Sequence, residues 1–514
     1  MALLTFAVFV AGMATLGIEL TASRLLGNVF GTSNIVWANI IGLILVYLTA
    51  GYFLGGRLAD RSPTPRSFYR LLAWASFTAG LVPIVARPVL MRAATAVERL
   101  DAALMVGSFL SVLILFSVPV TLLGCVSPFA IRLTIRDTTE AGRVSGRLYA
   151  ISTLGSIIGT FLPILWLIPA IGTARTFIAF SLGLMAVALV GLARSDGRRA
   201  ARFLWMPIAL IVLAWLVLRG PIKPTSGILE ERESAYNYIQ VLEREGVRYL
   251  LLNEGQGVHS VYAPGMEATF GTWDYFLAAP FFNPSPVELG QVTRLGLVGL
   301  AGGTIARQYT TVFGPIPIDG WEIDPQIIEI GRTYFGMDLP NLTAIAQDGR
   351  WGLAHSRNEY SVIGVDAYRL PYIPWHLTTR EFFVEVREHL AQDGVLAINV
   401  GRTPSDRRLI EALGGTLASV FPTIYVVDVP DTFNSILYAT VQATRQENLV
   451  ANLIALQGGE APKLLLDVLE RTIVNLRPPP ESGIVFTDDW APIEGLTNSI
   501  AIRFLFEGDL AILR

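Results

Sequence analysis

The sequence predicts an N-terminal α-helical transmembrane bundle of about seven helices, followed by an α/β domain with a mostly parallel sheet and a small β-cap. Two observations support this prediction. The 514-residue chain is 52% hydrophobic with a mean hydropathy of +0.50, which is too apolar for a soluble protein, and its long apolar stretches lie in residues 1–220. In the remainder, short apolar runs alternate with amphipathic ones, which is typical of strands alternating with helices.

Seven stretches are apolar over about the 20 residues that a helix needs to cross a bilayer. They cover residues 3–22, 35–55, 70–90, 104–124, 149–170, 173–193 and 203–219. The loops after the second, fourth and sixth stretches carry twelve Arg and the opposite side carries six, which places the N-terminus in the cytoplasm. We therefore expect a multi-pass protein of the cell inner membrane, with lipid as a partner. Seven crossings leave the C-terminal half outside the cytoplasm unless one stretch does not span, so the side of this half is left open.

Charge is divided unevenly along the chain. Residues 1–220 hold 18 Arg, no Lys and 7 acidic residues, a net of +11, whereas the remainder holds 21 basic and 35 acidic residues, a net of −14. This pattern is typical of membrane helices with basic loops followed by an acidic soluble domain. The acidic surplus suits a cationic ligand, and solubility explains it equally well. The single cysteine, Cys125, excludes a disulfide framework and a cysteine-based metal site.

Small residues recur at helical spacing in two of the apolar stretches. Gly51 and Gly55 share one helix face, as do Gly155 and Gly159. Such pairs let two helix backbones approach closely. We expect tight packing within a single bundle here, and a homodimer seam is the alternative.

After a linker that begins at residue 221, the strand and helix patterns become regular. Alternating strands near 233–241, 247–253 and 257–262 form the β-cap, and a short helix follows over 272–279. The expected strands are 294–299, 316–322, 342–346, 360–366, 394–400, 423–429 and 434–441, with helices over 303–309, 325–335, 349–355, 379–391 and 406–420. Two closing strands without a helix between them indicate an antiparallel edge, as in the class I methyltransferase-like (Rossmann-like) sheet. The predicted domains are thus 1–220 (transmembrane), 221–285 (linker and β-cap), 286–445 (Rossmann-like, adenosyl-ligand-binding) and 446–514 (C-terminal helical extension).

Glycines and acids follow four successive strands of this pattern. In chain order they are Gly299, Gly302 and Gly303, then Glu322, then Asp348 with Gly349, then Asp366. Because ligands of parallel α/β sheets bind beyond the carboxyl ends of the strands, these residues predict a nucleoside site. An acid after the second strand suits ribose hydroxyls, one after the third an adenine amino group, and one after the fourth the reacting group. Each acid taken alone is more often a helix N-cap, and the succession of four favours a ligand.

Several motifs along the chain occur together. They are Glu233-Ser234-x-Tyr236, Leu252-Asn253-Glu254-Gly255, the glycine turn (Gly299-Leu300-Ala301-Gly302-Gly303), Glu322-Ile323-Asp324, Asp348-Gly349, Val365-Asp366 and, near the end, Thr487-Asp488-Asp489-Trp490-Ala491-Pro492-Ile493-Glu494. On these residues the chain resembles the membrane-fused form of the spermidine synthase (aminopropyltransferase) family, in which a transporter-like helical region precedes the enzyme domain. The resemblance covers nearly the full chain.

The resemblance implies transfer of an aminopropyl group from decarboxylated S-adenosylmethionine, a co-substrate, to an amine, with release of methylthioadenosine. It implies a small-molecule amine as partner, with no nucleic acid and no metal. Carried over to this sequence, Glu322 binds the ribose, Asp348 the adenine, and Asp366 the aminopropyl ammonium. We assign catalysis to Asp366 and Asp274, donor binding to Asn237, Gly299, Gly302, Gly303, Glu322, Asp348 and Gly349, and substrate binding to His259, Tyr368, Arg369 and Tyr372.

Two positions depart from the family pattern. The family has a second aspartate three residues after the first in the loop after the fourth strand, whereas Arg369 stands at that place and would repel a diamine. The family's Tyr-Gln pair is Tyr236-Asn237 in this sequence. Asp274, Glu254, His259 and His376 are candidates for the missing base, although a lone histidine more often makes structural hydrogen bonds.

The substitution at Arg369 keeps two alternatives open. One is a methyltransferase-like enzyme that uses intact S-adenosylmethionine. The other is a non-catalytic, transporter-like membrane protein whose nucleotide domain senses a nucleoside or a polyamine. Aromatic residues near Arg369, Tyr368 and Tyr372, suit an amine through cation–π contacts, and covering the sheet edge is the alternative role.

Overall fold

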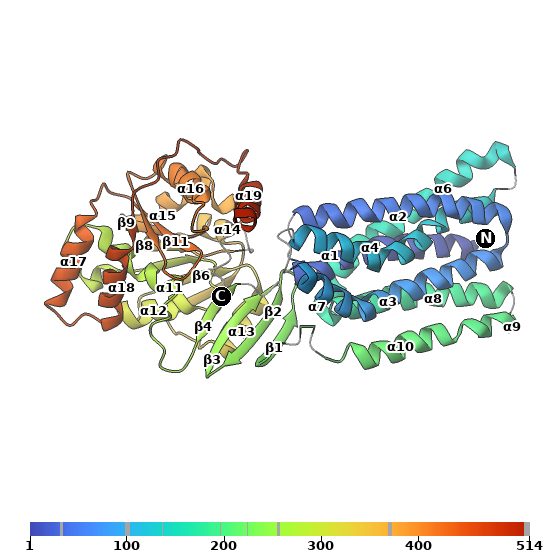
Figure 1. Cartoon of the computed structure of the whole chain (residues 1–514), viewed down its shortest axis with the longest axis horizontal. Helices are drawn as coiled ribbons and strands as arrows, with labels where there is room; N and C mark the ends of the chain where they lie inside the picture. Colours follow the sequence, from blue (N-terminus) through green and yellow to red (C-terminus); the bar gives the residue numbers. More distant parts are fainter. Residues whose placement is uncertain are drawn as a thin grey trace. The chain divides into compact units, whose positions relative to one another are not determined.

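The computed structural model describes residues 1–30, 34–97, 103–135, 137–195, 197–220, 222–223, 225–253, 257–368 and 373–507. The chain divides into two compact units (Figure 1). The first consists of Met1–Ser226 with Glu231–Tyr238, and the second of Gly227–Glu230 with Ile239–Arg514. The first unit is mainly helical and the second is an α/β unit. The domain boundaries expected at 285 and 445 stay predictions.

The helical unit contains six helices that are long and apolar enough to span a membrane, among the residues described. They cover Ala2–Phe30, Val36–Arg61, Pro65–Leu90, Val106–Thr134, Ala141–Ile171 and Thr173–Ser195. The underlying helices are α1 (Ala2–Phe30), α2 (Asn34–Arg61), α3 (Pro65–Val97), α4 (Ala103–Gly124), α5 (Val126–Thr134), α6 (Ala141–Leu162), α7 (Ile168–Ile171) and α8 (Thr173–Ser195). Six of the seven expected crossings are therefore present.

The seventh expected crossing, 203–219, corresponds to a shorter apolar helix, Ala201–Val217, which is not among these six. The segment begins in a 3-10 turn, and its helix, α10 (Trp205–Val217), has 13 residues. At 1.5 Å per residue, the whole helical segment Ala201–Val217 is about 26 Å long, somewhat shorter than the ~30 Å hydrocarbon layer. Apolar composition alone made this segment look like the other six.

The small-residue motifs pack inside the helical unit. A Cβ atom at Gly51 would clash with the backbone of α4, and one at Gly55 with the backbone of Cys125. Gly155 and Gly159 on α6 lie in the same way against the backbone of α1. The predicted packing within one bundle is confirmed for these four glycines, because a side chain at any of them would push two helices apart.

Four strands form the β-cap, and each is hydrogen-bonded to the next in the order β1-β2-β3-β4. They are β1 (Ile228–Glu233), β2 (Tyr238–Arg244), β3 (Val247–Leu252) and β4 (Val258–Tyr262). The single strand expected over 233–241 is wrong, because a turn separates β1 from β2. In that turn the Ser234 hydroxyl accepts hydrogen bonds from the backbone N–H groups of Tyr236 and Asn237, at 3.0 and 2.8 Å.

The main sheet has eight strands in the order β12-β10-β11-β9-β8-β5-β6-β7. They are β5 (Leu295–Val298), β6 (Ile318–Glu322), β7 (Leu342–Ala346), β8 (Tyr360–Val365), β9 (Leu390–Gly401), β10 (Thr423–Asp428), β11 (Asn434–Thr440) and β12 (Leu476–Arg477). Strands β5 to β9 pair in parallel, and β11 pairs antiparallel with both β9 and β10. This arrangement confirms the predicted class I methyltransferase-like fold. Because the chain leaves β5 for β6 and later returns to pair β8 with β5, the switch point lies between β5 and β8.

Both faces of the sheet are buried. Leu297 belongs to one apolar cluster and its neighbour Val298 to another, because successive strand side chains point to opposite faces. The helices of this unit are α11 (Thr272–Tyr275), α12 (Thr304–Phe313), α13 (Pro325–Tyr334), α14 (Gly349–Ala354), α15 (Arg380–His389), α16 (Arg408–Ala418), α17 (Glu447–Gln457), α18 (Lys463–Val474) and α19 (Ile493–Glu507). Short 3-10 segments, η4 (Phe276–Phe282) and η6 (Trp375–Leu377), complete it. The expected helix over 272–279 is thus a turn of α-helix continued as η4.

Candidate active site

The glycine turn after β5 is tight and lies at the switch point. Gly299 has φ +92°, and a Cβ atom there would lie 2.6 Å from the backbone oxygen of Asp366, at the end of β8. The backbone N–H of Gly302 donates to the Ser260 hydroxyl at 2.8 Å, so β4 of the cap supports the turn. Gly303, with φ +77°, precedes α12. Only glycine at 299 permits both this backbone conformation and this close approach.

Glu322, the last residue of β6, lies directly beside the turn. Its carboxylate accepts the backbone N–H of Ala301 at 3.0 Å and that of Asp324 at 3.1 Å. Only 8% of the residue is exposed, and this burial raises its pKa to about 7, although the backbone hydrogen bonds oppose the shift. Glu322 therefore changes charge close to neutral pH.

Asp348, after β7, is held by two different groups. One carboxylate oxygen caps α14 by accepting the Trp351 N–H at 2.9 Å, so the ordinary helix-cap role applies to this oxygen. The other lies 3.2 Å from Nε2 of His376. The hydrogen bond with His376 is the main cause that lowers the pKa of Asp348. The next residue, Gly349, lies against Val298, with 2.6 Å between its ideal Cβ position and that side chain.

Asp366 follows β8 at the switch point. Burial raises its pKa to about 6, and hydrogen bonds from Asn399 and Trp273 oppose the shift. The Asn399 amide donates to Asp366 at 2.8 Å, and Asn399 in turn accepts from the Asn434 amide at 3.0 Å. The Tyr368 hydroxyl donates to the backbone oxygen of Asn399 at 3.0 Å. Three strand ends, those of β8, β9 and β11, thus form one polar cluster.

The structure brings the glycine turn, Glu322, Asp348 and Asp366 to the carboxyl ends of adjoining parallel strands, as the sequence predicts. Sequence reasoning missed Asn399 and Trp273, which hydrogen-bond Asp366. Asn399 could have been identified from the sequence, since it is a polar residue near the end of the buried strand β9. Trp273 could not, because its contact with Asp366 joins positions far apart in the sequence.

The chain has relatives among the polyamine aminopropyltransferases, although no protein-family model matches it. A probable polyamine aminopropyl transferase of Bifidobacterium longum (strain NCC 2705) is 33% identical over 282 residues, which cover 52% of this chain and 61% of that protein. A polyamine aminopropyltransferase of Vibrio vulnificus (strain CMCP6) is 29% identical over 241 residues, which cover 44% of this chain and 75% of that protein. The chain is similar to these polyamine aminopropyltransferases over about half its length.

Among solved structures, the chain is similar to a probable spermidine synthase from Corynebacterium glutamicum ATCC 13032. The two are 21% identical, the match covers 47% of this chain and 90% of that one, and the TM-score is 0.39. The chain spans less than two thirds of the length of its Bifidobacterium relative.

The assignment of Asp274 as a proton acceptor stays a prediction, and the contacts of this residue favour another role. Asp274 is completely buried, and its carboxylate accepts five hydrogen bonds. The donors are the Thr269 N–H, the Thr269 hydroxyl, the Phe270 N–H, the Gln308 amide and the Arg471 guanidinium, at 2.5 to 3.0 Å. With both oxygens occupied and an ion pair to Arg471, Asp274 fixes α11 and the loop before it. This set of contacts argues for a structural role.

Other assigned residues do not follow a strand of the main sheet, or they fall outside the described part of the chain. Asn237 lies in the β1–β2 turn, which groups with the helical unit, and its donor-binding role stays a prediction. Arg369 and Tyr372 fall outside the described residues. His259 lies on β4 beside Ser260, and its Nε2 atom is buried without a hydrogen-bond partner among the described residues. Burial lowers the pKa of His259 to about 4, so it is neutral at pH 7.

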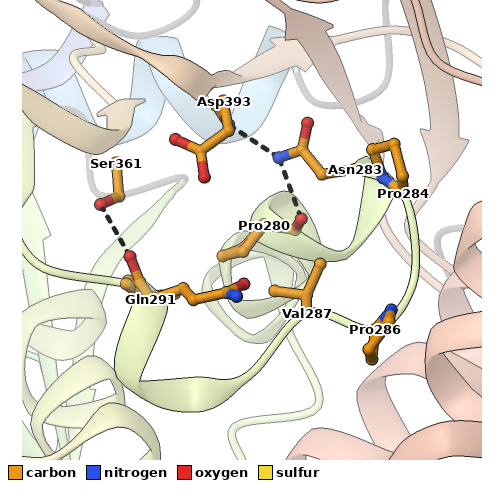
Figure 2. A pocket seen from close by; sticks show the side chains of 9 residues that line it. Pro280, Asn283, Pro284, Pro286, Val287, Gln291, Ser361 and Asp393 are labelled. Atoms are coloured by element: carbon orange, nitrogen blue, oxygen red, sulfur yellow. Dashed lines mark hydrogen bonds between the residues drawn. The ribbon is translucent and has the colours of Figure 1, made fainter.

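A separate cavity of about 170 Å³ lies near the amino end of β8 (Figure 2). It is lined by Pro280, Asn283, Pro284, Pro286, Val287, Gln291, Val292, Ser361 and Asp393. The Asn283 amide donates to the backbone oxygens of Pro280 and Asp393, at 3.2 and 2.7 Å. Because Ser361 is near the amino end of β8 and Asp366 follows its carboxyl end, this cavity is distinct from the candidate active site.

Proposed function

We propose that this chain is a membrane-anchored, spermidine synthase-like aminopropyltransferase. It moves an aminopropyl group from decarboxylated S-adenosylmethionine to an amine and releases methylthioadenosine. The observation that carries the proposal is the arrangement of Glu322, Asp348 and Asp366 around the glycine turn at the carboxyl ends of β5 to β8. The names of the Bifidobacterium and Vibrio relatives support the choice of reaction.

The first part of the site would bind the donor's nucleoside. Glu322 already accepts two backbone N–H groups, and its remaining lone pairs can accept the ribose hydroxyls. Asp348 keeps one oxygen for α14 and directs the other toward His376, where an adenine amino group can donate. The glycines at 299, 302 and 303 let the backbone approach the ligand closely. An S-adenosylmethionine-related nucleoside is the ligand class that these groups suit.

The transfer step needs alignment more than covalent catalysis. A neutral amine nitrogen attacks the carbon attached to the sulfonium, a C–N bond forms, and the C–S bond breaks. The electron pair of the C–S bond goes to sulfur, which leaves as the neutral thioether, and the new ammonium passes one proton to solvent. Asp366 would hold the donor's ammonium and orient the aminopropyl chain for this in-line attack.

The amine side of the site is assigned to His259, Tyr368, Arg369 and Tyr372. His259 is neutral at pH 7 and its buried Nε2 can accept an N–H without repelling a cation. The cation at Arg369 disfavours a simple diamine and favours an acceptor that carries a carboxylate. No metal and no nucleic acid take part in the proposed reaction.

The six spans support a cytoplasmic position for the enzyme unit at the cell inner membrane. The basic loops predict a cytoplasmic N-terminus, and an even number of crossings returns the chain to the same side. That side supplies the nucleoside donor. The conflict raised by seven crossings is thereby removed.

The proposal is tested by measuring the leaving group of the reaction, methylthioadenosine. The full-length protein, purified in detergent, is mixed with decarboxylated S-adenosylmethionine and a panel of diamines, polyamines and amino acids with a side-chain amine, and methylthioadenosine is measured by mass spectrometry. We expect amine-dependent release of methylthioadenosine. Formation of S-adenosylhomocysteine from intact S-adenosylmethionine would instead identify a methyltransferase. Nucleoside binding without any turnover would favour the sensing role, and a homodimer is checked by the mass of the detergent complex.

A further inference from the structure

A segment near the C-terminal end is built into the α/β unit. Phe486 is 1% exposed, its backbone N–H donates to the Thr416 hydroxyl at 3.0 Å, and its backbone oxygen accepts the Arg380 N–H at 2.8 Å. A Cβ atom at Gly415 of α16 would lie 2.6 Å from the backbone oxygens of Ser482 and Ile484. Residues 482–486 therefore occupy a fixed path that ends beside α15.

Asp488, two residues later, forms a bidentate pair with Arg350. Nη1 of Arg350 donates to Oδ1 of Asp488 at 2.8 Å, and Nη2 donates to Oδ2 at 2.9 Å. Nε and Nη2 of Arg350 donate to Glu385 on α15, at 2.9 and 2.7 Å, and Nη1 donates to the backbone oxygen of His376 at 3.0 Å. All five N–H groups of the guanidinium are thus used. Arg350 joins three separate segments through one planar group.

The Arg350 guanidinium binds the same segments that hold Asp348, the acid assigned to the adenine. Arg350 lies two residues after Asp348, and the His376 whose backbone it binds places its ring 3.2 Å from Asp348. Asp488 also accepts the Thr379 hydroxyl at 2.7 Å, and Thr379 caps α15. Asp488 therefore contacts the start of α14 and the segment after β8 at the same time.

We infer that Asp488 is a positioning residue for donor binding: through Arg350 and Thr379 it fixes Asp348 and His376 at the separation that the adenine requires. This inference rests on the proposed function, because it takes Asp348 to lie in the nucleoside site. Asp488 does not touch the ligand. Without Asp488, Arg350 keeps Glu385 and the His376 backbone as partners, but its guanidinium loses the bidentate partner that fixes its plane, and the Thr379 hydroxyl loses its acceptor.

Exposure separates this role from a general contribution to stability. The Asp488 side chain is 41% exposed, whereas that of Arg350 is 17% exposed. Ion pairs with an exposed partner contribute little to global stability, so the loss of Asp488 acts mainly on local geometry. The planar fork of Arg350 cannot be replaced by a lysine, which carries the charge without the bidentate geometry.

The test compares Asp488→Asn with Asp489→Asn in the full-length protein in detergent, using methylthioadenosine as the probe. Asp489 is the adjacent, exposed acid, so its variant removes the same charge. We expect Asp488→Asn to raise the Kd for methylthioadenosine about tenfold and Asp489→Asn to leave it within about twofold. Arg350→Lys should match Asp488→Asn, and the double variant should add little, because both remove the same link. In turnover, KM for the donor should rise while KM for the amine stays unchanged.

Each other outcome overturns the inference. Wild-type affinity in Asp488→Asn would contradict it and leave the proposed function standing. Equal weakening in both Asn variants would show an effect of charge and not of geometry. A loss of affinity only in proportion to a lower Tm would show a structural role. If the wild-type protein binds neither methylthioadenosine nor decarboxylated S-adenosylmethionine, the proposed function fails and the inference fails with it.

Discussion

At the scale of single residues, burial decides which strand-end acids can change charge. Glu322 and Asp366 both have raised pKa values, about 7 and about 6, because each lies beneath the glycine turn with few charged neighbours. Asp348 has a lowered pKa, because His376 and helix N–H groups stabilise its carboxylate. The three acids thus divide into one whose pKa is lowered and two whose pKa values lie near neutral pH.

The raised pKa of Glu322 predicts pH-dependent nucleoside binding. The carboxylate is the stronger acceptor for ribose hydroxyls, so affinity should fall as the pH falls through about 7, by up to tenfold per pH unit. Glu322→Gln should remove most of this slope. The measurement is calorimetric titration of methylthioadenosine between pH 5.5 and 8.5, values chosen to be about 1.5 units on either side of the pKa. The exposed Glu329→Gln on α13 is the control, and an unchanged slope in Glu322→Gln would refute the ribose assignment.

Asp274 shows where residue-level reasoning from the sequence fails. The sequence makes it a candidate for the missing base, but its partners Gln308 and Arg471 come from α12 and α18. No local pattern indicates a partner 197 residues away in the chain. Gly299, Glu322 and Asp366 could be assigned because strand ends and turns are local signals.

The structural role of Asp274 predicts loss of stability. Asp274→Asn should destabilise the α/β unit by about 2–4 kcal/mol, since it leaves the Arg471 charge unpaired beside a buried site. Thermal unfolding in detergent measures this, with the exposed Asp338→Asn as the matched control. The pH profile of the remaining turnover should keep its wild-type shape. A stable variant with no turnover would return Asp274 to the role of proton acceptor.

At the scale of elements, hydrophobic periodicity was sufficient to predict the strands and helices of the main sheet. Each strand and helix expected between 294 and 441 is present, and the closing antiparallel pair is confirmed. The sequence did not show that β11 lies between β9 and β10, since pairing order depends on long-range contacts. The β1–β2 turn was missed because Ser234 creates it through side-chain hydrogen bonds within an otherwise strand-like run.

The close packing of the turn between β5 and α12 predicts that one added methyl group at Gly299 weakens nucleoside binding. Gly299→Ala should weaken methylthioadenosine binding at least about tenfold, because the Cβ atom meets the Asp366 backbone and the φ of +92° is strained for alanine. Gly290→Ala is the control, since a Cβ there has nothing within 4 Å. Binding is measured by the same titration. Full affinity in Gly299→Ala would mean that the ligand does not depend on this turn.

At the scale of the whole molecule, composition predicted a membrane part and an α/β part, and both are present. The number of spans could not be predicted as well, because 203–219 has the apolar composition of a span without the helix length. That single difference changes the expected side of the enzyme unit.

The six-span account makes a direct prediction about topology. Reporters fused after Ser195, at the end of α8, and after Arg219, beyond α10, should both report the cytoplasm. The reason is that α10 is too short to cross the hydrocarbon layer. Paired phosphatase and fluorescent-protein fusions measure the side of each position. Opposite sides for the two fusions would make α10 a seventh crossing and remove the donor supply that the proposed function needs.

The central claim is tested most directly by following the transferred group itself. Decarboxylated S-adenosylmethionine carrying deuterium in its aminopropyl chain is incubated with the wild-type protein and with Asp366→Asn, and the amine products are analysed by mass spectrometry. We predict that the wild-type protein attaches the labelled chain to the acceptor nitrogen, and that Asp366→Asn does so at least about 100-fold more slowly while still binding methylthioadenosine. A wild-type protein that binds the nucleoside but labels none of the amines would contradict the account.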